Sequence, residues 1–214
     1  MAGRSRISRE AILEQAHRIL AEQGYGALTF QAVAEALGVS KQAIIYWFPS
    51  KWDLALAYAL RVLDGEAKAT IDATNQAGSA ASAIEGFVRA LVGHYLQHLG
   101  DFRMLYLAPQ FDRSIASAAP NADALAPIHQ KTSTIYAALE AKIALDPEFR
   151  PGESPRRLAV AVHMAGIGLL TMLAMAEAVN DPFRHSTEEL LDALVALLAQ
   201  PDTAMAEGRS PARR

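Results

Sequence analysis

The stretch GVSKQAIIYWFPSK, residues 38–51, places a run of large apolar residues between small and polar ones. Gly38 can adopt the positive φ that ends a helix, Ser40 can cap the helix that follows, and Pro49 terminates it. The stretch therefore predicts a short helix directly after a glycine turn. Because a helix turns by about 100° per residue, its apolar side chains cannot all face the same way.

This short helix is expected to have two different faces. On helical spacing, Ile44, Trp47 and Phe48 turn toward neighbouring helices and anchor it. The opposite face carries Lys41, Gln42, Ile45 and Tyr46.

Two helices are expected before it. The first runs over about residues 8–23, with Ser8 as N-cap and Gly24 as its stop. A second, short helix follows Thr29 and ends at Gly38. Two short helices joined by a tight turn are typical of a helix-turn-helix, which places its second helix in the major groove of DNA. The alternative is an ordinary buried helical hairpin, which the twin caps and the arginine-rich start of the chain disfavour.

The rest of the chain also predicts helices, so the fold class is all-α, with no period-2 strand pattern. A long helix should begin at Ser50, where Ser50 and Asp53 resemble a capping box, and end near residue 74. Further helices are expected over residues 82–99, 101–114, 122–145, 155–179 and 187–199. Residues 201–214 predict a loose C-terminal tail.

Composition limits the classes of function. The 214 residues contain no cysteine, which excludes a disulfide framework and a cysteine nucleophile and fits a cytoplasmic location. The start of the chain has no apolar segment of a secretory signal. The net charge is −3, but residues 1–53 hold six Lys or Arg against five Asp or Glu. Any affinity for a polyanion must therefore lie in the N-terminal part.

Residues 7–59 resemble the TetR/AcrR family of transcriptional regulators. The resemblance rests on the break at Gly24, on Thr29, on AEALGVS at 34–40 and on FPSK at 48–51. It implies a helix-turn-helix DNA-binding domain over residues 1–53 and a helical domain over 54–200 for effector binding and dimerisation.

The resemblance also implies the DNA contacts. Thr29 and Lys51 would hold phosphates, and Tyr46 would take over the phosphate contact of the tyrosine that Ile45 replaces. From its place on the exposed face, Ile45 itself is expected to pack on a thymine methyl group or on the edge of a sugar. Arg4 and Arg6 would bind a minor groove or phosphates, or else form a solvated arm. The complete implied set is Arg4, Arg6, Thr29, Ser40, Lys41, Gln42, Ile45, Tyr46, Trp47 and Lys51.

Residues 158–176, LAVAVHMAGIGLLTMLAMA, carry no charge and are long enough to span a membrane. His163, two glycines and the lack of an aromatic belt favour a helix buried in a bundle, so no membrane partner is expected. The resemblance implies that the last two helices form a homodimer interface. Its expected residues are Ala161, Ala165, Gly168, Leu191, Leu194 and Leu198.

Several aromatic, histidine and methionine residues of the larger domain suggest a mainly apolar cavity for a small hydrophobic or aromatic effector. The candidates are His94, Tyr95, His98, Arg103, Met104, Tyr106, Phe111, His129, Tyr136, His163 and Met172. Taken singly, each of them could equally be plain core. His94 and His98 have the i, i+4 spacing of metal ligands, but no HExxH motif or thiolate accompanies them, and no metal is expected.

The sequence shows no catalytic motif, so we expect neither an enzyme nor a cofactor. The expected function is a dimeric, ligand-responsive repressor that an effector releases from a near-palindromic operator. The alternative is a helical small-molecule-binding protein or enzyme whose N-terminal domain no longer reads DNA.

Overall fold

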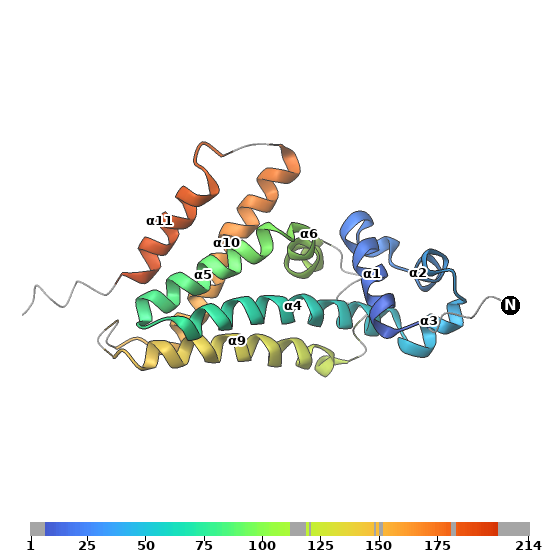
Figure 1. Ribbon diagram of the computed structural model, residues 1–214, viewed down its shortest axis with the longest axis horizontal. Helices are drawn as coiled ribbons and strands as arrows, with labels where there is room; N and C mark the ends of the chain where they lie inside the picture. Colours follow the sequence, from blue (N-terminus) through green and yellow to red (C-terminus); the bar gives the residue numbers. More distant parts are fainter. Residues whose placement is uncertain are drawn as a thin grey trace, which may run out of the picture. The chain divides into compact units, whose positions relative to one another are not determined.

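The computed structural model describes residues 7–111, 119, 121–147, 149, 152–180 and 183–200. Within these ranges the chain forms helices joined by turns and has no strand (Figure 1), which confirms the all-α prediction. Arg4, Arg6 and the expected tail over residues 201–214 lie outside the described residues.

The three N-terminal helices begin and end at the predicted residues. Helix α1 spans Arg9–Gln23, α2 spans Phe30–Leu37 and α3 spans Lys41–Trp47, with a 3-10 turn at Tyr25–Ala27. The side chains of Ser8, Thr29 and Ser40 each accept a hydrogen bond from the backbone N–H three residues later. Gly38 has a φ of 64°, the left-handed conformation that ends α2.

Helix α4, Lys51–Gln76, starts from the predicted reciprocal cap. The backbone N–H of Ser50 donates to the Asp53 carboxylate at 2.9 Å, and the backbone N–H of Asp53 donates to the Ser50 hydroxyl at 3.1 Å. Asp therefore does here what Glu does in the usual capping box.

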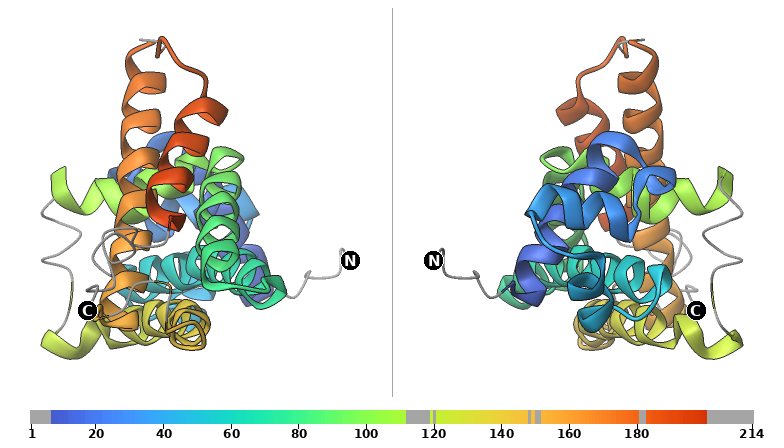
Figure 2. Two further views of the ribbon diagram at one scale, coloured as in Figure 1. Left: turned by 90° about the vertical axis from the view of Figure 1, so that its left-hand side faces the viewer. Right: turned by 90° about the vertical axis from the view of Figure 1, so that its right-hand side faces the viewer.

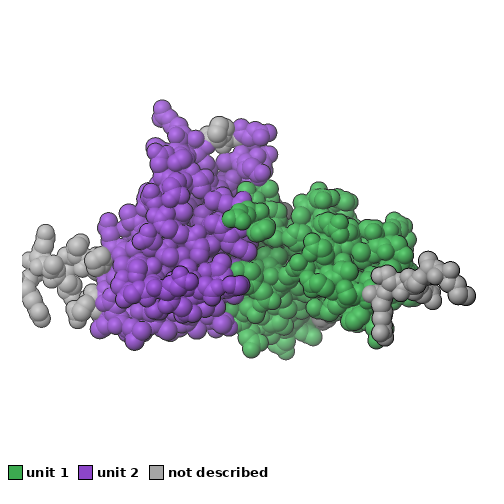
Figure 3. All heavy atoms as spheres, in the orientation of Figure 1, with its two compact units in different colours: residues 1–65, 97–131 green, residues 66–96, 132–214 purple. Residues whose placement is uncertain are grey.

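The chain folds into two compact units, which Figure 3 distinguishes by colour. Unit 1 contains residues 1–65 and 97–131, and unit 2 contains residues 66–96 and 132–214. This division differs from the one expected at residue 53, because residues 97–131 pack with the N-terminal helices. The functional boundary at residue 53 stays a prediction.

Helix α6, Leu99–Phe102, packs closely on α1 within unit 1. A Cβ atom on Gly100 would lie 3.4 Å from the Cβ of Ala21, so glycine allows a very close approach. The Tyr58 hydroxyl donates to Asp101 at 2.7 Å, and His17 Nδ1 lies 3.4 Å from the same carboxylate oxygen. The helix predicted over residues 101–114 is interrupted after Phe102 by a π-helical turn, Arg103–Leu107, which is followed by α7, Ala108–Phe111.

Unit 2 is built on α5, Ala80–Leu96, α9, Ala126–Ala144, α10, Pro155–Val179, and α11, Thr187–Ala199. A 3-10 turn, Ala122–Leu125, precedes α9, whose first residues belong to unit 1. Helices α10 and α11 lie beside α5 (Figure 2). Gly166 permits the close packing of α10 on α5, since a Cβ there would lie only 2.7 Å from Leu91 Cδ2.

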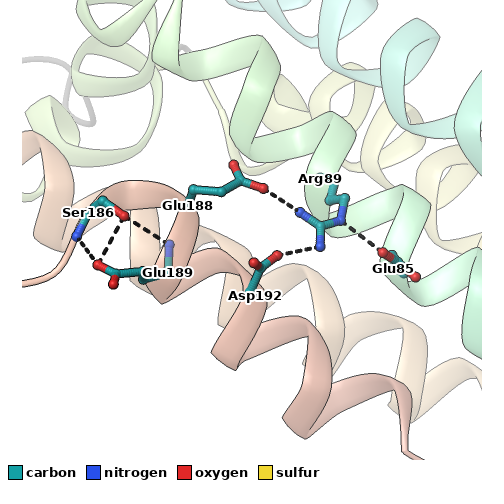
Figure 4. Close-up of polar contacts among 6 residues, drawn as sticks. All are labelled: Glu85, Arg89, Ser186, Glu188, Glu189 and Asp192. Carbon is teal, nitrogen blue, oxygen red and sulfur yellow. Dashed lines mark hydrogen bonds and ion pairs between the residues drawn. The ribbon is translucent and has the colours of Figure 1, made fainter.

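Arg89 fastens α11 to α5 (Figure 4). Its guanidinium group donates to Glu85 on its own helix at 2.9 Å, and to Glu188 and Asp192 on α11 at 3.1 and 2.5 Å. These bonds, to Asp192 above all, raise the pKa of Arg89 above its already high usual value. Ser186 and Glu189 form a capping box at the start of α11, and the bonds from Ser186 lower the pKa of Glu189.

Candidate DNA-binding face and effector region

Helix α3 has the two faces that the sequence predicts, with one correction. Ile44 and Phe48 are 0% and 2% exposed, whereas Ile45 and Tyr46 are 37% and 81% exposed. Trp47 was expected to face the core but is 39% exposed. The reason is that Ile44 and Phe48 occupy the core side, and the chain leaves the helix at Phe48, with φ −133° and ψ 96°.

The polar candidates around α3 are accessible. Thr29, Ser40, Lys41 and Gln42 are exposed, so each could reach DNA. Thr29 and Ser40 also cap α2 and α3, and each hydroxyl, while it accepts a backbone bond, can still donate one. Whether these residues contact DNA stays a prediction.

Lys51 has a structural contact that the sequence analysis missed. Its ammonium group donates to the backbone carbonyl of Tyr25 at 3.0 Å and lies 3.9 Å from the centre of the Tyr25 ring. Lys51 therefore ties the start of α4 to the turn after α1. An ammonium group has three donors, so a phosphate contact remains open to it.

An open hollow of about 520 Å³ lies beside α3. Ile7 and Ser8, at the start of α1, line it together with Ala43, Tyr46 and Trp47 of α3. The Tyr46 and Trp47 rings meet edge to face, with their centres 5.6 Å apart. No pattern in the sequence indicates this hollow, because it depends on how α1 packs against α3.

The expected effector residues divide between the two units. His94, Tyr95, Tyr136, His163 and Met172 belong to unit 2. His98, Arg103, Met104, Tyr106 and His129 belong to unit 1, and the side chain of Phe111 lies outside the described residues. Their shared role in effector binding stays a prediction.

Three of the unit 2 candidates do come together, around a buried carboxylate. Glu66 on α4 is fully buried; it accepts a bond from the Tyr95 hydroxyl at 2.6 Å, and its other oxygen lies 2.9 Å from His163 Nε2. The Tyr136 hydroxyl lies 3.1 Å from His163 Nδ1. With Nε2 protonated, His163 donates to Glu66 and accepts from Tyr136, which satisfies both ring nitrogens.

The buried network changes the pKa of Tyr136, which is its half-buried member. Burial raises the pKa of Tyr136, the negative charge of Glu66 raises it further, and Arg156, 5.1 Å over the ring, lowers it. Glu66 was not predicted from the sequence, although a signal exists. Glu66, Thr70 and Thr74 follow one another at four-residue spacing on one helix face, and all three are fully buried.

The two histidines with metal-ligand spacing do not share a helix. Helix α5 ends at Leu96, and His98 is the residue before α6. The His94 ring instead packs against the Tyr95 ring, with centres 4.9 Å apart. Among the described residues, no three His, Asp or Glu side chains group as metal ligands.

Helix α10 exposes an apolar stripe along one side, which we call the α10 stripe. Its residues are Ala161, Met164, Gly168, Met172, Met175 and Val179. Met172 therefore lies on this exposed stripe and not with the buried network. Ala165 is half-buried at its edge. By length and composition alone α10 could cross a membrane, but one such helix is weak evidence of a span.

The expected contribution of α11 to an interface needs correction at one position. Leu191 is buried within the chain itself, because this side of α11 packs on α5 and α10. Leu194 and Leu198 are half-buried, while Leu197 is exposed. Leu197, one residue before the expected Leu198, thus has the outward position.

The N-terminal helices are similar in sequence to a known protein family. Residues 12–58 match the sequence profile of the bacterial regulatory proteins of the tetR family. No curated protein sequence matches the chain.

Solved structures share the fold along most of the chain. A bacterial regulatory protein of the tetR family from Rhodococcus RHA1 is 19% identical, with a TM-score of 0.61 over 90% of this chain and 96% of that one. The regulator FadR from Bacillus subtilis, solved with stearoyl-CoA, is 13% identical, with a TM-score of 0.71 over 90% and 98%. AibR, solved with isovaleryl coenzyme A and operator DNA, is 16% identical, with a TM-score of 0.66 over 90% and 98%.

The profile match covers α2, α3 and their caps, which are the elements that place the exposed face of α3. Residues 12–58 are therefore similar to the bacterial regulatory proteins of the tetR family, and the chain shares its fold with solved regulators.

Proposed function

We propose that the protein is a cytoplasmic repressor that binds a near-palindromic operator as a homodimer. The observation that carries this proposal is the exposed face of α3, where the side chains of Lys41, Gln42 and Ile45 are accessible and do not pack into the core. Gln can pair with adenine and Lys can reach guanine in the major groove. Two copies of α3 would enter successive major grooves on one side of the duplex.

A small apolar effector would release the repressor. FadR and AibR were solved with acyl-CoA thioesters, which makes acyl-CoAs the first compounds to test on this chain. An effector of this kind need shift operator affinity by only about 1–3 kcal/mol, the usual coupling between two sites.

The test begins with selection of duplexes from a random-sequence library by the wild-type chain. We expect enrichment of an inverted repeat whose binding weakens steeply as salt rises, because phosphate contacts release counterions. Addition of acyl-CoAs of increasing chain length should then lower the affinity for that duplex. If no duplex is enriched at any salt concentration, the N-terminal domain does not read DNA and the proposal fails.

A further inference from the structure

Among the described residues, Lys41 is the exposed basic residue of α3, and three other basic side chains of the N-terminal unit already have partners. Lys51 is engaged with Tyr25, and the Arg61 guanidinium bridges Glu10 and Glu14 on α1 at 2.7 and 2.9 Å. Arg9 lies with its guanidinium carbon 5.1 Å from the centre of the Phe48 ring. DNA binders usually show a strongly basic face. A contact that does not depend on charge would therefore add to the affinity.

What this surface offers is aromatic and apolar. Tyr46 and Trp47 are both exposed, and together with Ile7 they form apolar walls of the hollow beside α3. Ala43 lines it with a side chain too small to fill it. Exposed aromatic residues that border a hollow are unfavourable in water unless a partner covers them.

The hollow lies on a definite side of α3. Residues 43, 46 and 47 share one side of the helix, next to the start of α1, while Lys41, Gln42 and Ile45 lie on the adjoining side. In an orientation that points Lys41, Gln42 and Ile45 at base edges, the side with residues 43, 46 and 47 would face the DNA strand that borders the groove. The hollow thus adjoins the candidate DNA-binding face, on the side that would meet the backbone and not the bases.

We propose that the hollow beside α3 receives a deoxyribose of the operator strand bordering the groove, with Trp47 and Tyr46 packing against the apolar face of the sugar. The inference rests on the proposed operator binding and adds the chemistry of the contact. Trp47 would then add to the affinity for DNA without a charge and without recognising the base sequence. Its contribution is independent of salt, unlike that of Lys41.

The test uses Trp47 as its own reporter. The chain has two tryptophans, so Trp52→Phe leaves Trp47 as the only indole. On titration with the duplex selected by the wild-type chain, Trp47 emission should change, and its quenching by acrylamide should fall severalfold. Unchanged quenching in the saturated complex would overturn the proposal.

Affinity measurements separate the sugar from other occupants. Trp47→Ala should weaken selected and random duplexes alike by about tenfold, as the loss of one aromatic stacking contact does, with the salt slope unchanged. Lys41→Ala is the matched control and should lower that slope. If the Trp47→Ala effect vanishes on a duplex with deoxyuridine in place of thymidine, the hollow holds a thymine methyl group and the proposal is wrong.

Three further outcomes are decisive. If Trp47 is already protected from acrylamide without DNA, and deletion of residues 1–6 exposes it, the chain's own arm fills the hollow and the proposal is wrong. If the wild-type chain binds its selected duplex and Trp47→Ala binds equally well, only this inference fails. If the wild-type chain selects no duplex, it is the proposed function that fails.

Discussion

Ile45 presents its aliphatic side chain on the exposed side of α3, next to Gln42 and Tyr46. An apolar group at this place has one natural apolar partner in the major groove, the thymine methyl group. Ile45→Ala should therefore relax the preference at one A·T position and cost about 1–3 kcal/mol of operator binding there. Binding to duplexes with single base-pair changes would measure it. If the variant instead unfolds while the folded fraction keeps its specificity, Ile45 belongs to the core.

Tyr46 should behave differently from its neighbour. Its hydroxyl is the group that would bond to a phosphate, so Tyr46→Phe should weaken operator and random duplexes by similar factors. Because the ring remains, the contact in the hollow beside α3 should survive in this variant. A loss confined to the operator would show that the hydroxyl reads a base.

Lys51 is expected to serve both stability and binding. Lys51→Ala removes a charge-assisted bond to the Tyr25 carbonyl and should lower the free energy of unfolding by about 1.5–3 kcal/mol. It should also reduce the salt slope of DNA binding by about one unit, if the ammonium group also holds a phosphate. Urea denaturation and binding at several salt concentrations would measure the two effects. An unchanged slope would limit Lys51 to its structural contact.

At this scale, the sequence predicted what depends on local geometry. The caps at Ser8, Thr29 and Ser40 and the turn at Gly38 follow from residue type and position, and all were confirmed. Trp47 was placed wrongly because helical spacing alone cannot show where α3 ends. Glu66 was missed because its partners lie 29 and 97 residues away, although its four-residue spacing with Thr70 and Thr74 indicates a shared helix face.

Helix α4 connects to α6 and α1 through Tyr58, Asp101 and His17. Burial, and next the bond to Asp101, raise the pKa of Tyr58 above its usual value. Above a pH of about 10 the unfolded chain loses this proton while the folded chain keeps it, so the stabilisation, complete below that pH, declines as pH rises. Tyr58→Phe lacks the hydroxyl and should be less stable than wild type at neutral pH.

The difference between these two proteins should shrink as pH rises above about 10. Thermal or urea unfolding of both proteins over that range would measure it. If the difference stays constant with pH, Tyr58 ionises alike in the folded and unfolded chain, and neither burial nor the bond to Asp101 raises its pKa.

The buried network of unit 2 also makes a prediction at the level of packed helices. Glu66→Ala removes the acceptor of Tyr95 and the partner of His163, both buried, and should cost about 3–5 kcal/mol. Thr70→Val, one turn further along the same buried face, loses only a bond to its own helix and should cost about 1 kcal/mol. Similar losses in the two variants by urea denaturation would mean that the network is no more than ordinary core.

Element boundaries were predicted well where they end in a cap or a proline, as in α10 and α11. The helix expected over residues 101–114 was described less well, because the π-helical turn at Arg103–Leu107 leaves no clear signal in spacing. The packing of α6 on α1 was not predicted, since it depends on contacts between residues about 80 positions apart, such as His17 and Asp101.

For the whole molecule, the α10 stripe is the strongest reason to expect a dimer. A monomer would leave these apolar residues in water, and their burial at about 25 cal/mol per Å² would favour association. Gly168→Asp would place a charge in the middle of the stripe and should yield monomers in sedimentation at micromolar concentration. Gly93→Asp, on α5, is a control at a position where a side chain meets no atom within 4 Å. A Gly168→Asp variant that stays dimeric would move the interface elsewhere.

The α10 stripe also determines how the protein responds to oxidants. Met164, Met172 and Met175 are three of the six methionines, all three are exposed, and the chain has no thiol to react first. Oxidation of each thioether to a sulfoxide replaces an apolar surface with a strongly polar one. Peroxide would therefore act on the same stripe as Gly168→Asp, and association of two copies would shield these sulfur atoms from it.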